Sequence, residues 1–215
     1  MILYYDKNKA VALKPVGVSS EGEEGMPGLV KKALSKKGIE TDVFPLHRLD
    51  VAVGGVMVFA LTKKYAAKMS EIISREAASE IKEKTFKKEY LAVVHGCPEE
   101  KIGVFEDLLF KDSRANKSFI VQRMRKGVKK ASLEYEVLAK KESLSLVRIL
   151  LHTGRTHQIR VQFSGRKMPL WGDGKYGGRD NGSIALFSYR LTLPDGQVFT
   201  VLPEKIAPWN MFETE

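Results

Sequence analysis

One short segment of the chain combines a carboxylate with a cation and glycines. His47, Arg48, Leu49 and Asp50 stand just before a glycine pair and the apolar run 55–61. A carboxylate where a loop enters a strand, beside residues that allow close backbone approach, is placed to meet a ligand. The alternative is a surface turn in which the aspartate pairs with a nearby arginine. These four residues alone favour that alternative.

A second segment, T-G-R-T-H-Q-I-R-V over residues 153–161, offers groups for contacts with phosphate or carboxylate. The candidate residues are Arg155, Thr156, His157, Gln158, Ile159 and Arg160. The spacing predicts a helix over 154–163, on which Thr156 and Arg160 share a face. A metal site is the rival idea, but His152 and His157 do not have a common ligand spacing and no third ligand is evident. We therefore expect no metal.

Tyr90 lies in a third segment, residues 86–95, whose composition is typical of a strand. Its ring could pack in the core, which is the more frequent case. Alternatively, it could stack against a nucleic-acid base.

Positive charge is concentrated in two segments. Residues 111–130 hold eight lysines and arginines against one aspartate, a net charge of +7, and residues 151–180 add +4 to a whole-chain charge of +10. This pattern is typical of a surface that binds a polyanion, and RNA or DNA is favoured over a membrane because no basic amphipathic helix is evident. The alternative is a solvated lysine-rich hairpin. We expect contacts with a nucleic-acid backbone from Arg123, Arg125, Lys126, Lys129 and Lys130.

Length and composition exclude several classes of protein. The chain has 215 residues and is 43% hydrophobic, which is enough for a packed core in one domain. No apolar run approaches the roughly 18 residues of a membrane span, and no signal peptide is evident at the start. The single cysteine, Cys97, cannot form an intramolecular disulfide. We therefore expect a cytoplasmic protein.

The pattern of apolar residues predicts more strands than helices. Strands are predicted over 9–14, 55–61, 86–95, 131–139, 144–151, 184–193 and 197–202, and helices over 26–37, 63–83 and 154–163. Many of the strands are linked by turns. The predicted fold class is therefore α+β, with a mixed, mostly antiparallel central β-sheet and flanking helices.

Four motifs in order resemble those of the RluA-type RNA pseudouridine synthases, which isomerise uridine in RNA. They are H-R-L-D-x-x-x-x-G-V-M-V-F-A from residue 47, K-x-Y-x-A-x-V-x-G from 88, G-R-T-H-Q-I-R-V from 154 and P-L-x-G-D-x-x-Y-G from 169. Lesser matches extend the resemblance over nearly the whole chain. It implies a pseudouridine synthase-like catalytic domain over residues 1–215, with no separate RNA-binding S4 domain.

The resemblance also implies roles for single residues. Asp50 matches the essential aspartate, Arg160 the arginine that pairs with it, Tyr90 the tyrosine that packs against the target base, and Arg48 an arginine that helps to hold the flipped-out nucleotide. It implies RNA, ribosomal or transfer, as the partner, with no cofactor and no metal. We expect a monomer, since no dimer seam is evident in the sequence.

The chain departs from the family pattern in its first motif. Val53 and Gly54 stand where the family usually has threonine and serine, and Leu61 where it usually has lysine. The charged trio of Asp50, Arg160 and Arg48 is intact, so we expect activity. Two alternatives stay open: a catalytically impaired RNA-binding protein of the same fold, and a nucleoside or polysaccharide hydrolase that uses Asp50.

Overall fold

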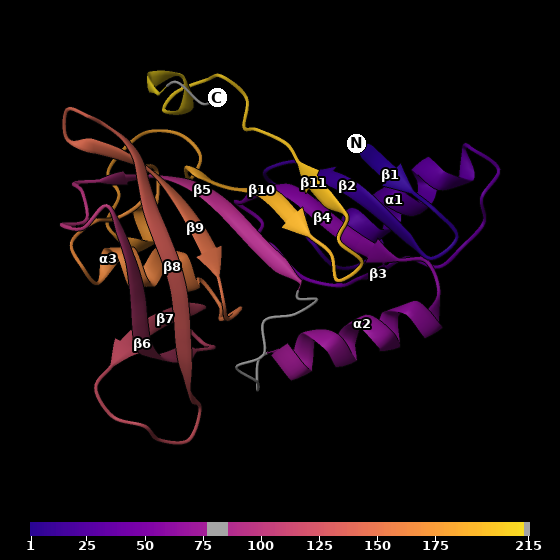
Figure 1. The fold of residues 1–215 in the computed structure, drawn as a ribbon, viewed down its shortest axis with the longest axis horizontal. Coiled ribbons are helices and arrows are strands. Elements are labelled where there is room, and N and C mark those ends of the chain that lie inside the picture. Colours follow the sequence, from indigo (N-terminus) through magenta and orange to yellow (C-terminus); the bar gives the residue numbers. More distant parts are fainter. Residues whose placement is uncertain (77–85, 213–215) are drawn as a thin grey trace. The chain divides into compact units, whose positions relative to one another are not determined.

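The computed structural model describes residues 1–76 and 86–212, which form two compact units. The first unit contains residues 1–76, 86–87 and 188–201, and the second contains residues 88–187 and 202–212. Figure 1 labels the helices and strands of both units. Among the described residues, no helix has the length and apolar character needed to cross a membrane.

The first unit is built on a sheet in which four strands lie in the order β1-β2-β4-β10, with β3 paired to β4 and β11 to β10. The pairs β1/β2, β2/β4, β3/β4 and β10/β11 are antiparallel. The strands are β1 (Ile2–Tyr5), β2 (Lys9–Lys14), β3 (Phe44–Pro45), β4 (Gly54–Ala60), β10 (Leu186–Thr192, of which the first two residues belong to the second unit) and β11 (Val198–Thr200).

Every residue of β4 is buried, as its unbroken apolar run predicts. Gly55 has φ +130°, and a Cβ atom there would lie 2.3 Å from the carbonyl oxygen of Ser188. Only glycine therefore allows β4 to approach β10 this closely. The core of this unit includes Val11, Val56 and Leu191.

Two helices accompany this sheet (Figure 1). Helix α1 (Met26–Ser35) contacts β2 and buries Met26, Val30 and Leu34, which follow each other at intervals of four residues. Helix α2 (Lys63–Glu76) contacts β4. The rest of the predicted helix, residues 77–83, lies outside the described residues.

The second unit contains five strands in the order β5-β9-β8-β6-β7, and each neighbouring pair is antiparallel. The elements are β5 (Lys87–His95, of which Lys87 belongs to the first unit), β6 (Ile102–Asp112), β7 (Lys117–Val121), β8 (Val128–Lys141), β9 (Leu144–Leu151) and helix α3 (Gln158–Ser164), with 3-10 turns η1 (Gly174–Tyr176) and η2 (Trp209–Met211). Helix α3 contacts β6 and β7. Leu109, Ala131, Val161 and Tyr176 form a core cluster beneath it.

The predicted α+β class with a mostly antiparallel sheet is confirmed. In β8, Leu133, Tyr135 and Val137 are buried while the residues between them are half-buried, as in a strand with one face in the core. Strands β1, β3, β6 and β7 were not among the predicted strands. The basic segment 111–130 accordingly includes the end of β6, all of β7 and the start of β8.

Candidate functional site

Asp50 lies in the first unit, on the connection between β3 and β4. This confirms the predicted position where a loop enters a strand. Asp50 is half-buried, and its backbone carbonyl oxygen accepts a hydrogen bond of 2.9 Å from the Val53 N–H. We call residues 49–53 the Asp50 loop. The turn that this bond closes gives the loop a defined backbone conformation.

The neighbours of Asp50 have different environments. His47 is held by the first unit, because its Nε2 accepts a hydrogen bond of 3.3 Å from the Val58 N–H and its ring meets Phe86 edge-on at 5.3 Å. Arg48 is exposed, and its Nη1 lies 3.2 Å from Oε2 of Glu21. The Arg48 side chain is therefore accessible to a ligand.

Tyr90 lies on β5 in the second unit, opposite Ile149 of β9. Only 5% of Tyr90 is exposed. The ring is therefore packed as a core side chain, which is the first of the two interpretations. Its contact with a target base stays a prediction.

The Arg160 side chain forms a buried ion pair within the second unit. Its Nε lies 2.7 Å from Oδ2 of Asp173 and its Nη2 lies 2.7 Å from Oδ1, so the two groups form a two-pronged ion pair. Asp173 is completely buried and the Arg160 side chain is 6% exposed. The guanidinium also lies 5.1 Å from the centre of the Tyr176 ring. Such a pair fixes the direction of the guanidinium and neutralises part of its charge.

Tyr176 joins α3 to the β6–β7 hairpin. Its hydroxyl contacts Nδ1 of His157 at 3.0 Å and accepts a hydrogen bond of 2.8 Å from the Ser118 N–H. The Ser118 hydroxyl in turn donates to the carbonyl of Thr156 at 2.6 Å. The segment before α3 is therefore bonded to Ser118 of β7, directly through Thr156 and indirectly through Tyr176.

The predicted helix over 154–163 is wrong at its start, because α3 begins at Gln158. His157 has φ +53°, a left-handed conformation that interrupts a helix. The Gln158 side chain stabilises the preceding loop, since its Oε1 accepts hydrogen bonds from Thr153 Oγ1 at 2.7 Å and from the Arg155 N–H at 3.0 Å. Thr156 therefore lies in the loop and shares no helical face with Arg160.

The five cations that were predicted to contact a nucleic-acid backbone are exposed. Arg123, Arg125 and Lys126 lie on the connection between β7 and β8, and Lys129 and Lys130 lie on β8. Arg155 is tied to this strand, because its Nε donates a hydrogen bond of 2.9 Å to the Lys130 carbonyl. The two basic segments predicted from the sequence therefore meet at Lys130.

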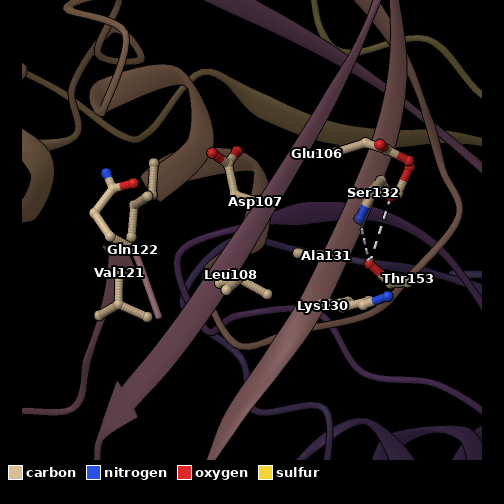
Figure 2. Close-up of a pocket in the computed structure, with 10 residues that line it drawn as sticks. Glu106, Asp107, Leu108, Val121, Gln122, Lys130, Ala131, Ser132 and Thr153 are labelled. Atoms are coloured by element: carbon tan, nitrogen blue, oxygen red, sulfur yellow. Dashed lines mark hydrogen bonds between the residues drawn. The ribbon is translucent and has the colours of Figure 1, made fainter. Parts of the chain in front are cut away.

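A pocket of about 480 Å³ lies beside these cations. Figure 2 shows Val121 and Gln122 on one side and Ser132 with Thr153 on the other, where Thr153 Oγ1 accepts a hydrogen bond of 3.0 Å from the Ser132 N–H. Its lining residues are Glu106, Asp107, Leu108, Ile120, Val121, Gln122, Lys130, Ala131, Ser132 and Thr153. The pocket thus combines an apolar surface with hydrogen-bonding groups of both kinds, two carboxylates and one cation.

The structure adds residues that the sequence analysis did not select. Asp173 and Tyr176 belong to the fourth motif, P-L-x-G-D-x-x-Y-G, which was the available signal, but no role was predicted for them. In the described ranges 1–76 and 86–212, no three His, Cys, Asp or Glu side chains are grouped so that they could hold a metal ion. Asp50 belongs to the first unit and Arg160 to the second, so the predicted pairing of the two stays a prediction.

Comparison with known proteins supports the resemblance noted in the motifs. Residues 8–165 match the family model of RNA pseudouridylate synthases. The ribosomal large subunit pseudouridine synthase C of Buchnera aphidicola subsp. Acyrthosiphon pisum (strain APS) is 30% identical over 180 residues, which cover 83% of this chain and 54% of that protein. The ribosomal large subunit pseudouridine synthase D of Borreliella burgdorferi is 31% identical over 215 residues, with 91% and 61% covered. The chain thus spans a little more than half the length of the curated relatives it matches.

Solved structures show the same fold. The human RNA pseudouridylate synthase domain containing 4 superposes with a TM-score of 0.76 and 25% identity, covering 94% of this chain and 88% of that one. The human RNA pseudouridylate synthase domain containing 1 has a TM-score of 0.73 at 24% identity, with 96% and 84% covered. The motifs, the family model and the fold agree, and the chain belongs to the RNA pseudouridylate synthase family.

Proposed function

We propose that this chain isomerises uridine in RNA to pseudouridine, with Asp50 as its catalytic carboxylate. The observation that carries the proposal is the family match over residues 8–165, which contain Asp50, Tyr90 and Arg160. The Asp50 loop supports it, because a half-buried aspartate on a hydrogen-bonded turn is a suitable place for a reacting group.

The chemistry of this isomerisation requires few groups. The N1–C1′ bond of the nucleotide breaks, the uracil turns, and a C5–C1′ bond forms. C5 loses its proton and N1 gains one, so no electrons are transferred. A glycosidase, which passes the sugar to water, usually needs two carboxylates. An isomerase that keeps the uracil bound needs one, acting as nucleophile or base, and Asp50 fills that role.

Arg160 and Tyr90 complete the proposed centre. Arg160 pairs with Asp50 and stabilises its charge, and Asp173 holds the guanidinium in place for this purpose. The target uridine must leave the base stack, at a cost of a few kcal/mol. Packing against Tyr90 and contacts from Arg48 to the flipped-out nucleotide offset this cost. The segment from Arg155 to Ile159 lies directly before Arg160 and contacts the same nucleotide.

The RNA strand next to the target crosses the exposed cations of the second unit. Arg123, Arg125, Lys126, Lys129 and Lys130 contact its phosphates. The pocket beside Lys130 takes one neighbouring nucleotide, because its volume suits a small ligand and its Gln122 amide can bond to the edge of a base (Figure 2).

A substitution that fills the pocket tests this path. Leu108→Trp places a bulky ring in the pocket, and Val104→Trp places the same ring on the same strand at an exposed position outside the pocket lining. We expect Leu108→Trp to weaken binding of an RNA transcript in a filter-binding titration by about tenfold, which is about 1.4 kcal/mol. Equal affinities of the two variants would contradict a nucleotide in the pocket.

The finer aspects of function follow from the same proposal. The RNA is ribosomal or transfer RNA, and the names of the relatives favour ribosomal RNA. Both units together form one catalytic domain over residues 1–215, which acts as a monomer in the cytoplasm. A single cysteine is compatible with that reducing compartment.

Product analysis tests the proposed reaction against its alternatives. Ribosomal and transfer RNA transcripts are incubated with the protein, digested to nucleosides and separated by chromatography. The isomerase reaction yields pseudouridine without loss of base. Free uracil would indicate a hydrolase. Bound but unchanged RNA would indicate a catalytically impaired RNA-binding protein.

A further inference from the structure

The Asp50 loop is bonded to one segment of the first unit, residues 14–20, which we call the support segment. This segment contains the end of β2 and the loop that follows it. It contributes two buried polar side chains, those of Lys14 and Ser20, which are 1% and 4% exposed. A buried lysine and a buried serine are unusual unless their polar atoms are bonded, so their partners are informative.

Ser20 binds the residue directly before Asp50. Its hydroxyl donates a hydrogen bond of 2.7 Å to the Leu49 carbonyl and accepts one of 2.9 Å from the Leu49 N–H. Both backbone groups of Leu49 are thus satisfied by one side chain. These two hydrogen bonds fix the peptide that leads into Asp50.

Lys14 binds the residues directly after Asp50. Its ammonium donates hydrogen bonds to the carbonyls of Val51 at 3.2 Å, Val53 at 2.7 Å and Pro15 at 3.0 Å. The Val51 carbonyl accepts a further bond of 2.8 Å from the Gly17 N–H. The support segment therefore holds the loop on both sides of Asp50.

Asp50 also acts on Lys14 through its charge. Burial lowers the pKa of Lys14 to about 8, and the carboxylate of Asp50 works against this shift. The two groups are therefore within electrostatic reach of each other. The cost of burying a lysine is substantial, and a position that only filled the core would be better served by an apolar side chain.

We propose that Lys14 and Ser20 are positioning residues that hold the Asp50 carboxylate in its reactive place. This inference rests on the proposed function of Asp50. Neither side chain needs to touch the RNA, because each acts through the backbone of the loop. Loss of either should lower the rate of the reaction more than it lowers RNA binding, since small displacements of a reacting group cost up to about a hundredfold in rate.

The sharpest test compares two buried serines. Ser20→Ala removes a hydroxyl that donates to the Leu49 carbonyl at 2.7 Å, and Ser145→Ala removes one that donates to the Gly96 carbonyl at the same distance in the second unit. The two variants therefore lose the same kind of donated bond, and Ser20→Ala also loses the bond that its hydroxyl accepts from the Leu49 N–H. We expect kcat for pseudouridine formation to fall at least about tenfold in Ser20→Ala, with KM and RNA affinity within about twofold of wild type. Ser145→Ala should keep the wild-type kcat.

A second pair tests the lysine. Lys14→Met removes the ammonium under the loop, and Lys9→Met removes the other buried lysine of β2, whose Nζ lies 2.7 Å from Oδ2 of Asp195. We expect only Lys14→Met to lower kcat. Amide hydrogen exchange adds a readout that needs no turnover: Leu49 and Val53 should exchange faster in Ser20→Ala and Lys14→Met than in the two control variants.

The outcomes separate this inference from the proposed function. If the wild type forms pseudouridine and Ser20→Ala matches Ser145→Ala in kcat, the positioning role is wrong and the function stands. If the wild type forms none, the proposed function fails. In that case, if the Leu49 amide exchanges at the same rate in Ser20→Ala as in wild type, the claim that Ser20 holds the loop is wrong as well.

Discussion

Exchange of Asp173 for asparagine should destabilise the protein more than any comparable loss of a surface charge. The variant keeps the shape of the side chain but removes the carboxylate charge that faces the Arg160 guanidinium at position 173. Asp173 is completely buried and the Arg160 side chain is 6% exposed, so water cannot replace the lost carboxylate. Removal of one member of such a buried pair costs about 3–5 kcal/mol. That is a large fraction of the roughly 5–15 kcal/mol that stabilises a typical domain.

Asp195→Asn is the matched control for this experiment. Asp195 also pairs with a buried cation at 2.7 Å, Lys9, but its own side chain is 45% exposed. Water therefore screens the pair, and its loss should cost about 1 kcal/mol or less. Urea unfolding at pH 7, followed by circular dichroism, gives both free energies. Equal losses in the two variants would refute the reasoning that burial makes the Asp173 pair essential.

Three further predictions concern charge. The triple variant Arg123→Ala, Arg125→Ala and Lys126→Ala should weaken RNA binding and flatten the dependence of log Kd on log salt by about 0.7–0.9 per lost phosphate contact; an unchanged slope would remove this segment from the interface. Arg160→Ala should abolish turnover while circular dichroism shows a folded protein, and a normal rate would remove Arg160 from the site. Burial lowers the pKa of Lys14 from 10.5 to about 8, so between these values the unfolded chain holds a proton that the folded chain has released. The unfolding free energy of wild type relative to Lys14→Met should therefore rise by about 3 kcal/mol from pH 7 to pH 10.5, and a falling difference would contradict it.

Much of the fold could be predicted from local apolar patterns. Strands β2 and β9 begin and end at the predicted residues, 9–14 and 144–151, because short apolar runs between turn residues are strong signals. Strand β6 was missed because charged residues interrupt its apolar pattern, and β7 because it has only five residues. Their residues are stabilised by pairing with β8 and by contact with α3, which no local pattern records.

The start of α3 shows why a boundary can be missed. Residues 154–163 have suitable spacing for a helix, but the Gln158 side chain bonds to Thr153 and to the Arg155 N–H and so stabilises a loop before the helix. His157 then takes a left-handed conformation. A side chain that competes for backbone groups outweighs propensity here.

The candidate site could be predicted only in part. Asp50 and Arg160 were identified from motifs, but their supports come from elsewhere in the chain. Asp173 binds Arg160, which is 13 residues away in the sequence, and Lys14 binds Val53, which is 39 residues away. Lys14 was read as the end of a strand, since nothing in its neighbourhood indicates that a lysine will be buried. Such contacts depend on tertiary packing and not on local pattern.

The most direct test of the central claim is tritium release from RNA that carries [5-³H]uridine. Formation of the C5–C1′ bond expels the C5 hydrogen, so each isomerised uridine releases one tritium to water. Wild type and Asp50→Asn are compared on ribosomal and transfer RNA transcripts, with Asp42→Asn, an exposed aspartate of the first unit, as the matched control. We predict release by wild type and Asp42→Asn and none by Asp50→Asn. Release by Asp50→Asn at the wild-type rate would contradict Asp50 as the catalytic carboxylate.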